Sequence, residues 1–430
     1  MDVLLYTRGW IMKVLLISPG IDGDSNRTLA EANSSRTLTP MLSLPYLAAL
    51  TPPEIQIKVI DEIHGISNNY EEADLVGITG MTMQANRMYT IADMYRSMNI
   101  PVVLGGVHVT FMYEEAARHG NSVVIGEAED LWLKIINDFY NNKLKRYYHC
   151  KQYPSLSKLP TPRLDLMKGP MYSGDKGSLN VVMATRGCPY QCSYCSVSKM
   201  CGRKYRRRPV DHVVNEIERI SDNNFFFSDD NLIANKKYSK ELFRKLKKLQ
   251  KKWGAQVSIN IAEDEEMLDL AHDCGCISLF IGIESTNPNN LAEIKKSINK
   301  VEKYSDSIKK IHDRGIHIHA SFMVGFDDDQ ENVFDDIYNF SVTNKIENPV
   351  VNIVTPLPGT DLYKKLLGEG RIINNNWEKY NFLNVVFQPN NLSVDALQNK
   401  FEELNKGIRR YKTGLSLVKY RTESGLNNNE

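Results

Sequence analysis

The chain has 430 residues, 42% of them hydrophobic and 24% charged, which is an ordinary globular balance and enough length for two or three domains. Its 53 basic and 52 acidic side chains leave a formal net charge of +1, which argues against a nucleic-acid partner because phosphate binding usually needs a basic excess. No apolar run approaches the roughly 20 residues of a membrane span. The seven cysteines, odd in number and mostly clustered, favour a reducing cytoplasm over a secreted disulfide scaffold.

Short apolar segments alternate with helical patterns in the first third of the chain. Strands are expected at residues 13–18, 57–63, 73–80, 100–106 and 121–127, and helices at 84–98 and 114–120. Buried strands separated by helices predict a parallel, doubly wound α/β sheet, and we place this first domain at residues 1–140. Sheets of this kind bind ligands at the carboxyl ends of their strands.

Small residues occupy those carboxyl ends: Ser18 to Gly20, Thr79 to Thr82, Gly105 with Gly106, and Gly126. The fingerprint G-x-G-x-x-G does not follow the first strand, so the sequence predicts a nucleotide-type fold without nicotinamide chemistry. The glycines are open to two interpretations, because they could border a ligand or only allow tight turns.

A second series of strands and helices begins after a connector at residues 141–178, which is rich in lysine, proline and tyrosine. Its strands are expected at 179–187, 224–231, 255–263, 278–285, 316–326 and 350–359. Strand–helix units with polar residues at the strand ends predict a partial (β/α)6 barrel at 179–360, with its site at the C-terminal rim. Residues 361–430 are predicted to form a polar, helical extension.

The segment TRGCPYQCSYCSVSKMC, residues 185–201, holds four of the seven cysteines. Cys188, Cys192 and Cys195 are spaced C-x3-C-x2-C directly after an expected barrel strand, and no histidine lies near them. Zinc sites usually join two cysteine pairs, or a pair and histidines, across roughly 12 or more residues. Three cysteines in one loop suit three irons of a cubane and leave the fourth iron open, although zinc stays an alternative. Cys201 falls outside the spacing and is expected to be a packing thiol.

This C-x3-C-x-Tyr-C segment resembles the signature of the radical S-adenosylmethionine (SAM) superfamily, with Tyr194 as the aromatic residue before the third cysteine. The resemblance implies a 4Fe-4S cluster held by Cys188, Cys192 and Cys195, with SAM bound at the open iron. It further implies that reduction of the cluster cleaves SAM to methionine and a 5′-deoxyadenosyl radical.

The same resemblance implies SAM contacts at the ends of the later barrel strands. In chain order the expected contacts are Asp229 and Asp230, Ser258 and Asn260, Glu284, and the main chain of Val324 and Gly325. The segment FFFSDDN departs from the Gly-Gly-Glu form of the wider superfamily, and its two aspartates could instead cap the following helix. Glu284 lies in the apolar strand LFIGIES, where an unpaired acid would cost energy, so it is the strongest single candidate.

Residues 73–130 closely resemble the cobalamin-binding domain of cobalamin-dependent radical SAM enzymes, and the likeness extends over nearly the whole chain. It implies that the backbone of Gly105 and Gly106 approaches the nucleotide tail of cobalamin. Thr79 to Met81 take the place of a Ser-x-Leu segment in related domains, and Gly126 is a further candidate contact. The histidine that ligates cobalt in methionine synthase-like domains should follow the first strand, but SPGIDGDSNR contains none.

The resemblance therefore implies a cytoplasmic, cobalamin-dependent radical SAM enzyme that methylates an unactivated carbon of a small-molecule or natural-product substrate. An electron donor such as flavodoxin or ferredoxin is the expected partner. The main alternative is an enzyme of the same kind that rearranges or cyclises its substrate without methyl transfer. A tRNA methylthiotransferase would need a second cluster, but residues 1–140 contain no cysteine. A zinc-binding interaction module, the last rival, would contain no iron.

Overall fold

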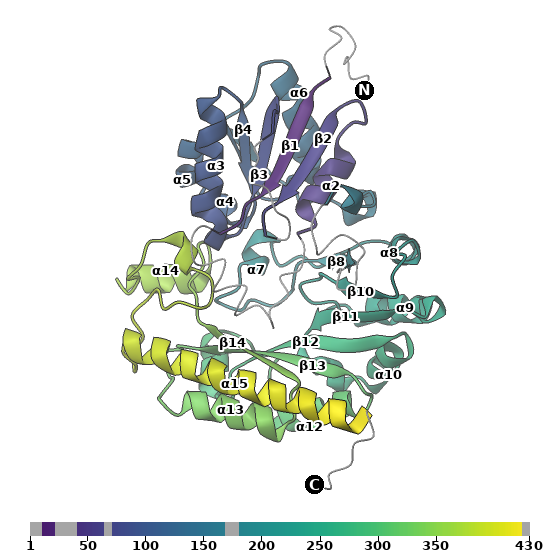
Figure 1. The fold of residues 1–430 in the computed structure, drawn as a ribbon, viewed down its shortest axis with the longest axis vertical. Helices are drawn as coiled ribbons and strands as arrows, with labels where there is room; N and C mark the ends of the chain where they lie inside the picture. Colours follow the sequence, from purple (N-terminus) through teal and green to yellow (C-terminus); the bar gives the residue numbers. More distant parts are fainter. Residues whose placement is uncertain (1–10, 22–40, 64–70, 168–179, 424–430) are drawn as a thin grey trace. The chain divides into compact units, whose positions relative to one another are not determined.

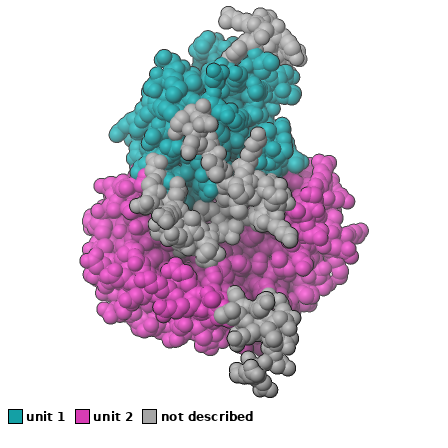
Figure 2. All heavy atoms as spheres, in the orientation of Figure 1, with its two compact units in different colours: residues 1–30, 39–179 teal, residues 31–38, 180–430 magenta. Residues whose placement is uncertain are grey.

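The computed structural model describes residues 11–21, 41–63, 71–167 and 180–423, with side chains described through residue 414 (Figure 1). The chain divides into two compact units, coloured teal and magenta in Figure 2. Of the described residues, 11–21, 41–63 and 71–167 belong to the first unit, and 180–423 belong to the second.

A six-stranded parallel sheet forms the centre of the first unit, which confirms the predicted α/β class. Its strands are β1 (Lys13–Ser18), β2 (Gln56–Asp61), β3 (Leu75–Thr79), β4 (Val102–Gly105), β5 (Ser122–Ile125) and β6 (Tyr147–His149). Their order in space is β2-β1-β3-β4-β5-β6, so the direction of winding reverses between β1 and β3. The carboxyl ends of β1 and β3 flank the crevice where such sheets bind ligands. Strand β6 lies within 141–178, the range expected as a connector.

Helices cover both faces of this first sheet (Figure 1). They are α2 (Ser43–Leu50), α3 (Ala85–Ser97), α4 (Val107–Phe111), α5 (Tyr113–His119) and α6 (Glu129–Tyr140), with the 3-10 turn η1 (Thr82–Gln84) before α3 and the turns η2 (Leu156–Lys158) and η3 (Leu164–Leu166) after β6. Side chains alternate across a strand, and Val14 and Leu16 of β1 pack with Leu44 of α2 and Trp132 of α6. Helices α3, α4 and α5 pack against β3, β4 and β5 on the other face.

The second unit contains another six-stranded parallel sheet, in which each strand pairs with the next one along the chain. Its strands are β7 (Val181–Val182), β10 (Asn224–Phe227), β11 (Lys252–Val257), β12 (Cys276–Glu284), β13 (His317–Val324) and β14 (Asn348–Ile353). This sequential order is that of a barrel wall that remains open, as predicted. A separate antiparallel pair, β8 (Thr185–Arg186) and β9 (Arg206–Arg207), joins the two ends of the cysteine-containing segment.

Helices follow each strand of this sheet, as right-handed parallel connections require. They are α7 (Val197–Met200), α8 (Val210–Glu218), α9 (Lys236–Leu246), α10 (Glu265–Asp273), α11 (Pro288–Glu293), α12 (Tyr304–His312), α13 (Val333–Thr343) and α14 (Asp361–Gly368), with 3-10 turns η4 (Lys247–Leu249), η5 (Ile259–Glu263), η6 (Val301–Lys303) and η7 (Trp377–Lys379).

The last helix, α15 (Val394–Glu423), packs against α13 and β14 (Figure 1). Leu397, Phe401, Leu404 and Ile408 recur at helical spacing and are all buried, so one apolar face of the helix closes the core of the second unit. Within the described ranges, no helix combines the length and apolar character needed to cross a membrane.

Candidate functional site

Cys188, Cys192 and Cys195 lie in one loop between β8 and α7, which follows the first strand of the second sheet. Cys192 is buried, and the other two are partly buried. None of the seven cysteines forms a disulfide. Among the described residues, no group of three or more His, Cys, Asp or Glu side chains is arranged to hold a single metal ion. The cysteine thiolates that hold a cubane cluster each bind a different iron, so the three side chains need not converge on one point.

The three thiols are electrostatically coupled. Burial raises the pKa of Cys188, Cys192 and Cys195, that of Cys195 to about 12, and the charge of Cys192 adds to the rise at the other two thiols. Such a triad holds its protons near neutral pH unless a cation compensates the negative charge. Metal binding replaces those protons, so the environment fits an iron–sulfur cluster that is bound through thiolates.

Two aspartates at the end of β10 fix the segment that leads into the cysteine loop. Asp229 accepts hydrogen bonds from the main-chain N–H of Ala184 at 3.1 Å and of Thr185 at 2.5 Å, and also from the Thr185 hydroxyl. Asp230 accepts from the N–H of Gly187 at 2.7 Å. Neither aspartate caps a helix, which was the alternative considered from sequence. Burial raises the pKa of Asp229 to about 7, although these hydrogen bonds oppose the rise.

Gly187 is required by this geometry. Its φ is +93°, and a Cβ atom there would lie 2.2 Å from the carbonyl oxygen of Lys204. Any other residue would push apart the two ends of the loop that β8 and β9 hold together. The glycine directly before Cys188 therefore has a structural reason that does not involve a ligand.

Further contacts hold the middle and the end of the loop. Ser193, between two of the cysteines, donates its N–H to the carbonyl of Ile294 at 3.0 Å and accepts from the N–H of Leu362 at 2.9 Å. Beyond the third cysteine, the Lys199 ammonium contacts Asp361 of α14 at 2.5 Å. The loop is thus attached at several points to segments that are distant in sequence, which restricts the positions of its thiols.

Glu284 contacts the cysteine loop directly. Its Oε1 atom accepts a hydrogen bond from the Tyr194 hydroxyl at 2.8 Å and lies 2.5 Å from the Lys296 ammonium. Its Oε2 atom makes no such contact with the described residues. Burial and the charge of Glu284 raise the pKa of Tyr194 well above its usual value, so the phenol remains a donor. One carboxylate oxygen is therefore occupied, and the other is available to a ligand.

The backbone at Glu284 is in an unusual conformation. Its φ is +66°, and the register between β12 and β13 shifts between Gly282 and Glu284. Left-handed non-glycine residues that persist in folded proteins cost about 1–3 kcal/mol and cluster at functional sites. The surrounding chain holds this conformation: Asn299 donates to the carbonyls of Gly282 and Ile283, and the Tyr304 hydroxyl also donates to Ile283.

Ser258 directly precedes the 3-10 turn η5 and Asn260 lies within it, so both residues follow β11. Ser258 exchanges two hydrogen bonds with Asn231, at 2.9 Å through its hydroxyl and 3.3 Å through its N–H. The pKa of Tyr190, in the cysteine loop, is raised by burial and by Cys188, and a hydrogen bond from Ser258 opposes the rise. The Oδ1 atom of Asn260 is buried and has no partner among the described residues. It is an unpaired acceptor of the kind that a ligand could satisfy.

The turn after β13 is fixed by Asp329, a buried residue that sequence reasoning missed. Asp329 accepts from the N–H of Gly325 at 2.7 Å and of Phe326 at 3.0 Å, and burial raises its pKa to about 6. The carbonyl of Val324 accepts from the N–H of Val354 at 2.9 Å. Two of the main-chain groups expected to meet adenine, the N–H of Gly325 and the carbonyl of Val324, therefore already have one partner each. The run of three aspartates in GFDDDQ is the signal that could have indicated this turn.

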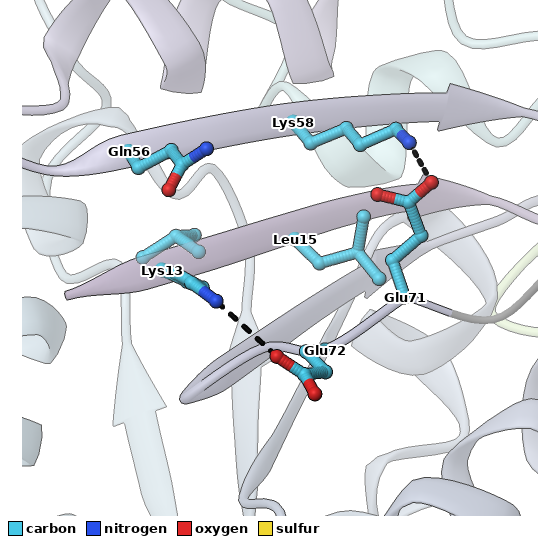
Figure 3. A pocket seen from close by; sticks show the side chains of 7 residues that line it. Lys13, Leu15, Gln56, Lys58, Glu71 and Glu72 are labelled. Carbon is cyan, nitrogen blue, oxygen red and sulfur yellow. Dashed lines mark hydrogen bonds and ion pairs between the residues drawn. The ribbon is translucent and has the colours of Figure 1, made fainter.

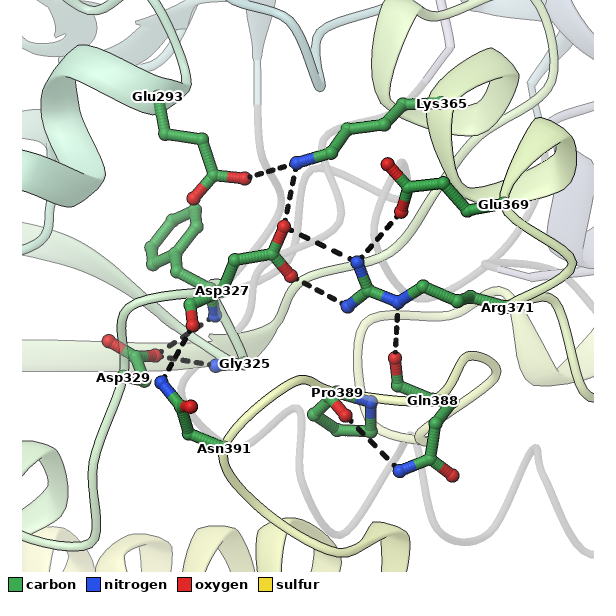
Figure 4. A network of polar contacts seen from close by, with 11 residues as sticks. Glu293, Gly325, Asp327, Asp329, Lys365, Glu369, Arg371, Gln388, Pro389 and Asn391 are labelled. Atoms are coloured by element: carbon green, nitrogen blue, oxygen red, sulfur yellow. Dashed lines mark hydrogen bonds and ion pairs between the residues drawn. The ribbon is translucent and has the colours of Figure 1, made fainter.

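A polar network surrounds the same turn (Figure 4). The Asp327 carboxylate contacts Lys365 at 2.6 Å and Arg371 at 2.6 Å, and Lys365 also contacts Glu293 at 3.0 Å. Burial alone would raise the pKa of Asp327, but Arg371 and Lys365 hold it below the usual range. Asn391 donates to the main-chain carbonyl of Asp327 at 2.8 Å. These bonds fasten the C-terminal region to the rim of the sheet.

The remaining cysteines of the second unit are in the interior. Cys201 is 6% exposed and packs against Gly187, while Cys274 and Cys276 are 3% and 4% exposed at the start of β12. The basic run RKYRRR, residues 203–208, is only partly a surface feature. Arg208 is buried, donates to the Met183 carbonyl at 2.8 Å and pairs with buried Glu216 at 2.6 Å. This arginine therefore has a structural role.

His317, His319 and Tyr380 of the second unit each bond to another residue of that unit. His317 is the first residue of β13, at the amino edge of the sheet, and contacts Glu347 at 3.0 Å. His319 contacts Asn348 at 2.7 Å. The Tyr380 hydroxyl donates to the carbonyl of Asn374 at 2.7 Å.

In the first unit, small residues line the carboxyl edge as the sequence predicts, and two of the glycines there have a structural reason. A Cβ atom on Gly106 would lie 2.7 Å from the Thr79 hydroxyl, and one on Gly126 would lie 2.7 Å from Cys150, so both glycines are needed by the fold. Both also have positive φ. Gly105 differs, because its Cβ would meet only Val124 at 3.8 Å. Its backbone is therefore open to a close approach by a ligand.

A buried glutamine holds the two loops that flank the crevice. Gln84 accepts from the N–H of Met81 at 2.7 Å and donates to the carbonyl of Pro19, which joins the loops after β3 and β1. Glu62 accepts from the N–H of Gly20 at 2.8 Å and from Arg87 at 2.9 Å. Sequence reasoning missed these supports, although a glutamine at the start of a helix was visible. The Ser18 hydroxyl at the end of β1 is buried and has no partner among the described residues.

His108 follows the carboxyl end of β4. It is completely buried in α4, where its Nε2 atom lies 3.1 Å from the Tyr89 hydroxyl and 3.5 Å from Glu115. His64 and the residues from 22 to 40 lie outside the described residues. The prediction that cobalamin binds without a histidine ligand therefore stays a prediction.

A surface pocket of about 310 Å3 lies at the opposite, amino edge of the first sheet (Figure 3). Lys13 and Gln56, which line it, begin β1 and β2, and ion pairs join Lys13 to Glu72 and Lys58 to Glu71. Because ligands of doubly wound sheets bind at the carboxyl edge, this pocket is not the candidate site.

Comparisons with known proteins agree with both units. Residues 58–135 match the B12 binding domain, and residues 182–341 match the radical SAM superfamily. The chain is 31% identical over 404 residues to the bacteriochlorophyllide d C-12(1)-methyltransferase of Chlorobaculum tepidum, which covers 92% of this chain and 87% of that protein. It is 33% identical over 362 residues to the bacteriochlorophyllide d C-8(2)-methyltransferase of the same organism, covering 81% and 80%.

A solved structure of the radical SAM methyltransferase TsrM from Kitasatospora setae has the same fold, with a TM-score of 0.66 at 16% identity over 83% of this chain and 76% of that one. Two matched domains in this order define a cobalamin-binding sheet followed by a radical SAM barrel. The chain belongs to the cobalamin-dependent radical SAM family. It is a methyltransferase of that family and uses a 4Fe-4S cluster, SAM and cobalamin.

Proposed function

We propose that this methyltransferase transfers a methyl group to an unactivated carbon of a small-molecule or natural-product substrate. The observation that carries the proposal is the likeness, over at least 80% of each chain, to two relatives that are named for methylation at C-12(1) and C-8(2) of bacteriochlorophyllide d. Both names specify carbon positions of a small organic molecule. The bound cofactors supply the radical and the methyl group, and the protein supplies binding, orientation and exclusion of water.

The residues of the second unit have separate tasks in this proposal. Cys188, Cys192 and Cys195 hold the cluster, since their buried, coupled thiols suit a cationic partner. Glu284 meets SAM through its second carboxylate oxygen, next to Tyr194, which holds the first. Further SAM contacts are proposed at the unpaired Oδ1 atom of Asn260, the hydroxyl of Ser258, and the main chain of Val324 and Gly325.

In this proposal Asp229 and Asp230 position the cysteine loop, because their observed hydrogen bonds go to the segment directly before it. A direct contact between these aspartates and the ammonium of SAM stays a prediction from the resemblance. In either case the carboxylates keep the loop close to the end of β10, which orients the thiols toward the strand ends.

In the first unit, the carboxyl edge fits cobalamin. A ligand can approach the backbone of Gly105 closely, and the buried Ser18 hydroxyl has no hydrogen-bond partner among the described residues. Thr79, Met81, Gly106 and Gly126 complete the proposed contact set. Gln84 fixes the main chain of Met81, so the loop need not be ordered when the cofactor binds.

The cluster must receive an electron before SAM is cleaved, and we propose an external donor such as flavodoxin or ferredoxin for this step. The donor gives one electron to the cluster and forms no bond with it. Exposed cations next to the cysteine loop, at Arg203 and Lys204, are a suitable contact for an acidic protein of this kind.

Replacing Glu284 by glutamine should weaken SAM binding about ten- to a hundred-fold, because a hydrogen bond to a charged group contributes about 1.5–3 kcal/mol. The cluster should remain, since Glu284 is not one of its ligands. Equilibrium binding of SAM to the anaerobically reconstituted protein measures the change, and the iron content of the same sample provides the control. An affinity equal to that of the wild type would remove Glu284 from the SAM site.

The proposed function is tested by offering the loaded, reduced enzyme SAM with a deuterated methyl group and bacteriochlorophyllide d as the first probe substrate. Mass spectrometry should find a product that carries the deuterated methyl on carbon. A rearranged or cyclised product without deuterium would instead support the alternative reaction. A product methylated on oxygen or nitrogen would contradict the proposal that carbon is the acceptor.

A further inference from the structure

Lys296 is a largely buried lysine that sequence reasoning did not single out. Its side chain is 13% exposed, and its ammonium lies 2.5 Å from Glu284 and 3.4 Å from the Tyr194 hydroxyl. A lysine is rarely buried unless an opposite charge compensates for the loss of water. The ion pair with Glu284 keeps it charged: burial would lower the pKa of Lys296, but Glu284 and the nearby cysteines raise it above the usual value.

The space around this ion pair is closely fitted. A Cβ atom on Gly282 would lie 2.3 Å from Oε1 of Glu284 and 2.7 Å from the ammonium of Lys296. The strand therefore needs glycine at position 282 to admit both groups. The left-handed backbone occurs at Glu284 itself, the residue that supplies the carboxylate of this pair.

Lys296 also lies beside the cysteine loop. Its ammonium is 3.4 Å from the hydroxyl of Tyr194, which stands between Cys192 and Cys195 in the sequence. Glu284 contacts the same hydroxyl at 2.8 Å, so both charges of the ion pair meet the loop at this tyrosine. The pair as a whole is neutral, and removing one of its charges leaves the other uncompensated next to the loop.

We propose that Lys296 is a positioning residue: its ammonium holds the carboxylate of Glu284 beside the cysteine loop, and its positive charge favours the reduced state of the cluster. The inference rests on the proposed attachment of the cluster to Cys188, Cys192 and Cys195. Reduction adds one electron from the external donor to the cluster and breaks no bond, so the negative charge of the site increases by one. A fixed cation in a site of low dielectric stabilises that added charge.

The test is the midpoint potential of the cluster in the anaerobically reconstituted full chain without SAM. Electron paramagnetic resonance monitors the reduced cluster at each applied potential. Lys296→Met should lower the ratio of reduced to oxidised cluster about tenfold at a fixed applied potential, which corresponds to 59 mV for one electron. Lys296→Arg should restore the wild-type ratio within about twofold. Lys295→Met is the matched control, because Lys295 is the exposed neighbour and the change in net charge is the same.

Glu284→Gln provides a second, opposite test. It removes the negative end of the pair, so the ratio of reduced to oxidised cluster should rise, and the double variant with Lys296→Met should return near the wild type. A purely structural role for Lys296 would not give shifts of opposite sign. The proposal is overturned if Lys296→Met behaves as Lys295→Met does, or if both single variants shift the ratio in the same direction.

The proposed cluster site and the proposed role of Lys296 can be disproved separately. If the wild-type chain binds no iron, the proposed cluster site is wrong, and this is known before any potential is measured. If the wild type holds a complete cluster and the variants do not shift its potential as stated, the role of Lys296 is wrong and the cluster site stands. Should Lys296→Met fail to fold, the sign of the Glu284→Gln shift still decides.

Discussion

Replacing any one of Cys188, Cys192 and Cys195 by alanine should abolish reductive cleavage of SAM, with a loss of at least a thousandfold in the release of 5′-deoxyadenosine. Each thiol is proposed to bind a different iron, so the loss of one leaves an iron without a protein ligand. The other two thiols cannot replace it, because Asp229, Asp230 and the contacts of Ser193 restrict the loop. Iron and labile sulfide in the anaerobically purified variants should fall together with activity.

Cys201→Ala is the matched control for these variants. Cys201 lies in the same segment, is buried against Gly187 and falls outside the C-x3-C-x2-C spacing. Its replacement removes one buried sulfur and should leave the cluster and SAM cleavage in place, with a modest loss of stability of about 1–2 kcal/mol from the lost packing. Loss of the cluster in Cys201→Ala together with its retention in Cys188→Ala would reverse the assignment.

Asp229→Ala should destabilise the second unit by about 2–6 kcal/mol, because it leaves two buried main-chain N–H groups without an acceptor and each such group costs about 1–3 kcal/mol. The affected groups are the N–H of Ala184 and of Thr185, which lie directly before the cysteine loop. The cluster content of the reconstituted protein should fall as well, since the loop loses its fixed start. Urea unfolding of the protein without cofactors measures the stability change.

Asp211→Ala serves as the control for the Asp229 variant. The Asp211 side chain is 71% exposed and pairs with Lys245 on the surface. Exposed ion pairs contribute about 0–1 kcal/mol, so this variant should unfold near the wild-type midpoint. Equal midpoints for Asp229→Ala and Asp211→Ala would mean that the hydrogen bonds of Asp229 do not hold the loop.

Local patterns predicted the fold well because strand and helix signals lie within short windows. The apolar runs at 13–18 and 316–326 indicated β1 and β13 almost to the residue. The three residues of β6 escaped detection, because Tyr147–His149 is too short to give a periodic signal inside a polar connector. It pairs with β5 through contacts that only the folded chain brings together.

The candidate site was predictable where its chemistry lies in consecutive residues and unpredictable where it depends on distant ones. The cysteine spacing and the acid in the apolar strand at Glu284 are visible in the sequence. Lys296 lies 102 residues from Tyr194, and Asp229 lies 44 residues from Thr185. No local pattern reports such pairs, so the lysine was missed and the hydrogen bonds of the aspartates to the segment before the loop were not predicted.

The central claim is that cobalamin and the cluster serve one reaction in this chain, and the most direct test is to load the enzyme with each cofactor separately. With deuterated SAM, reductant and a substrate that the fully loaded enzyme methylates, protein that holds the cluster but no cobalamin should still release 5′-deoxyadenosine and should transfer no deuterated methyl. Adding cobalamin should restore the labelled product. Equal methyl transfer with and without cobalamin would contradict the account.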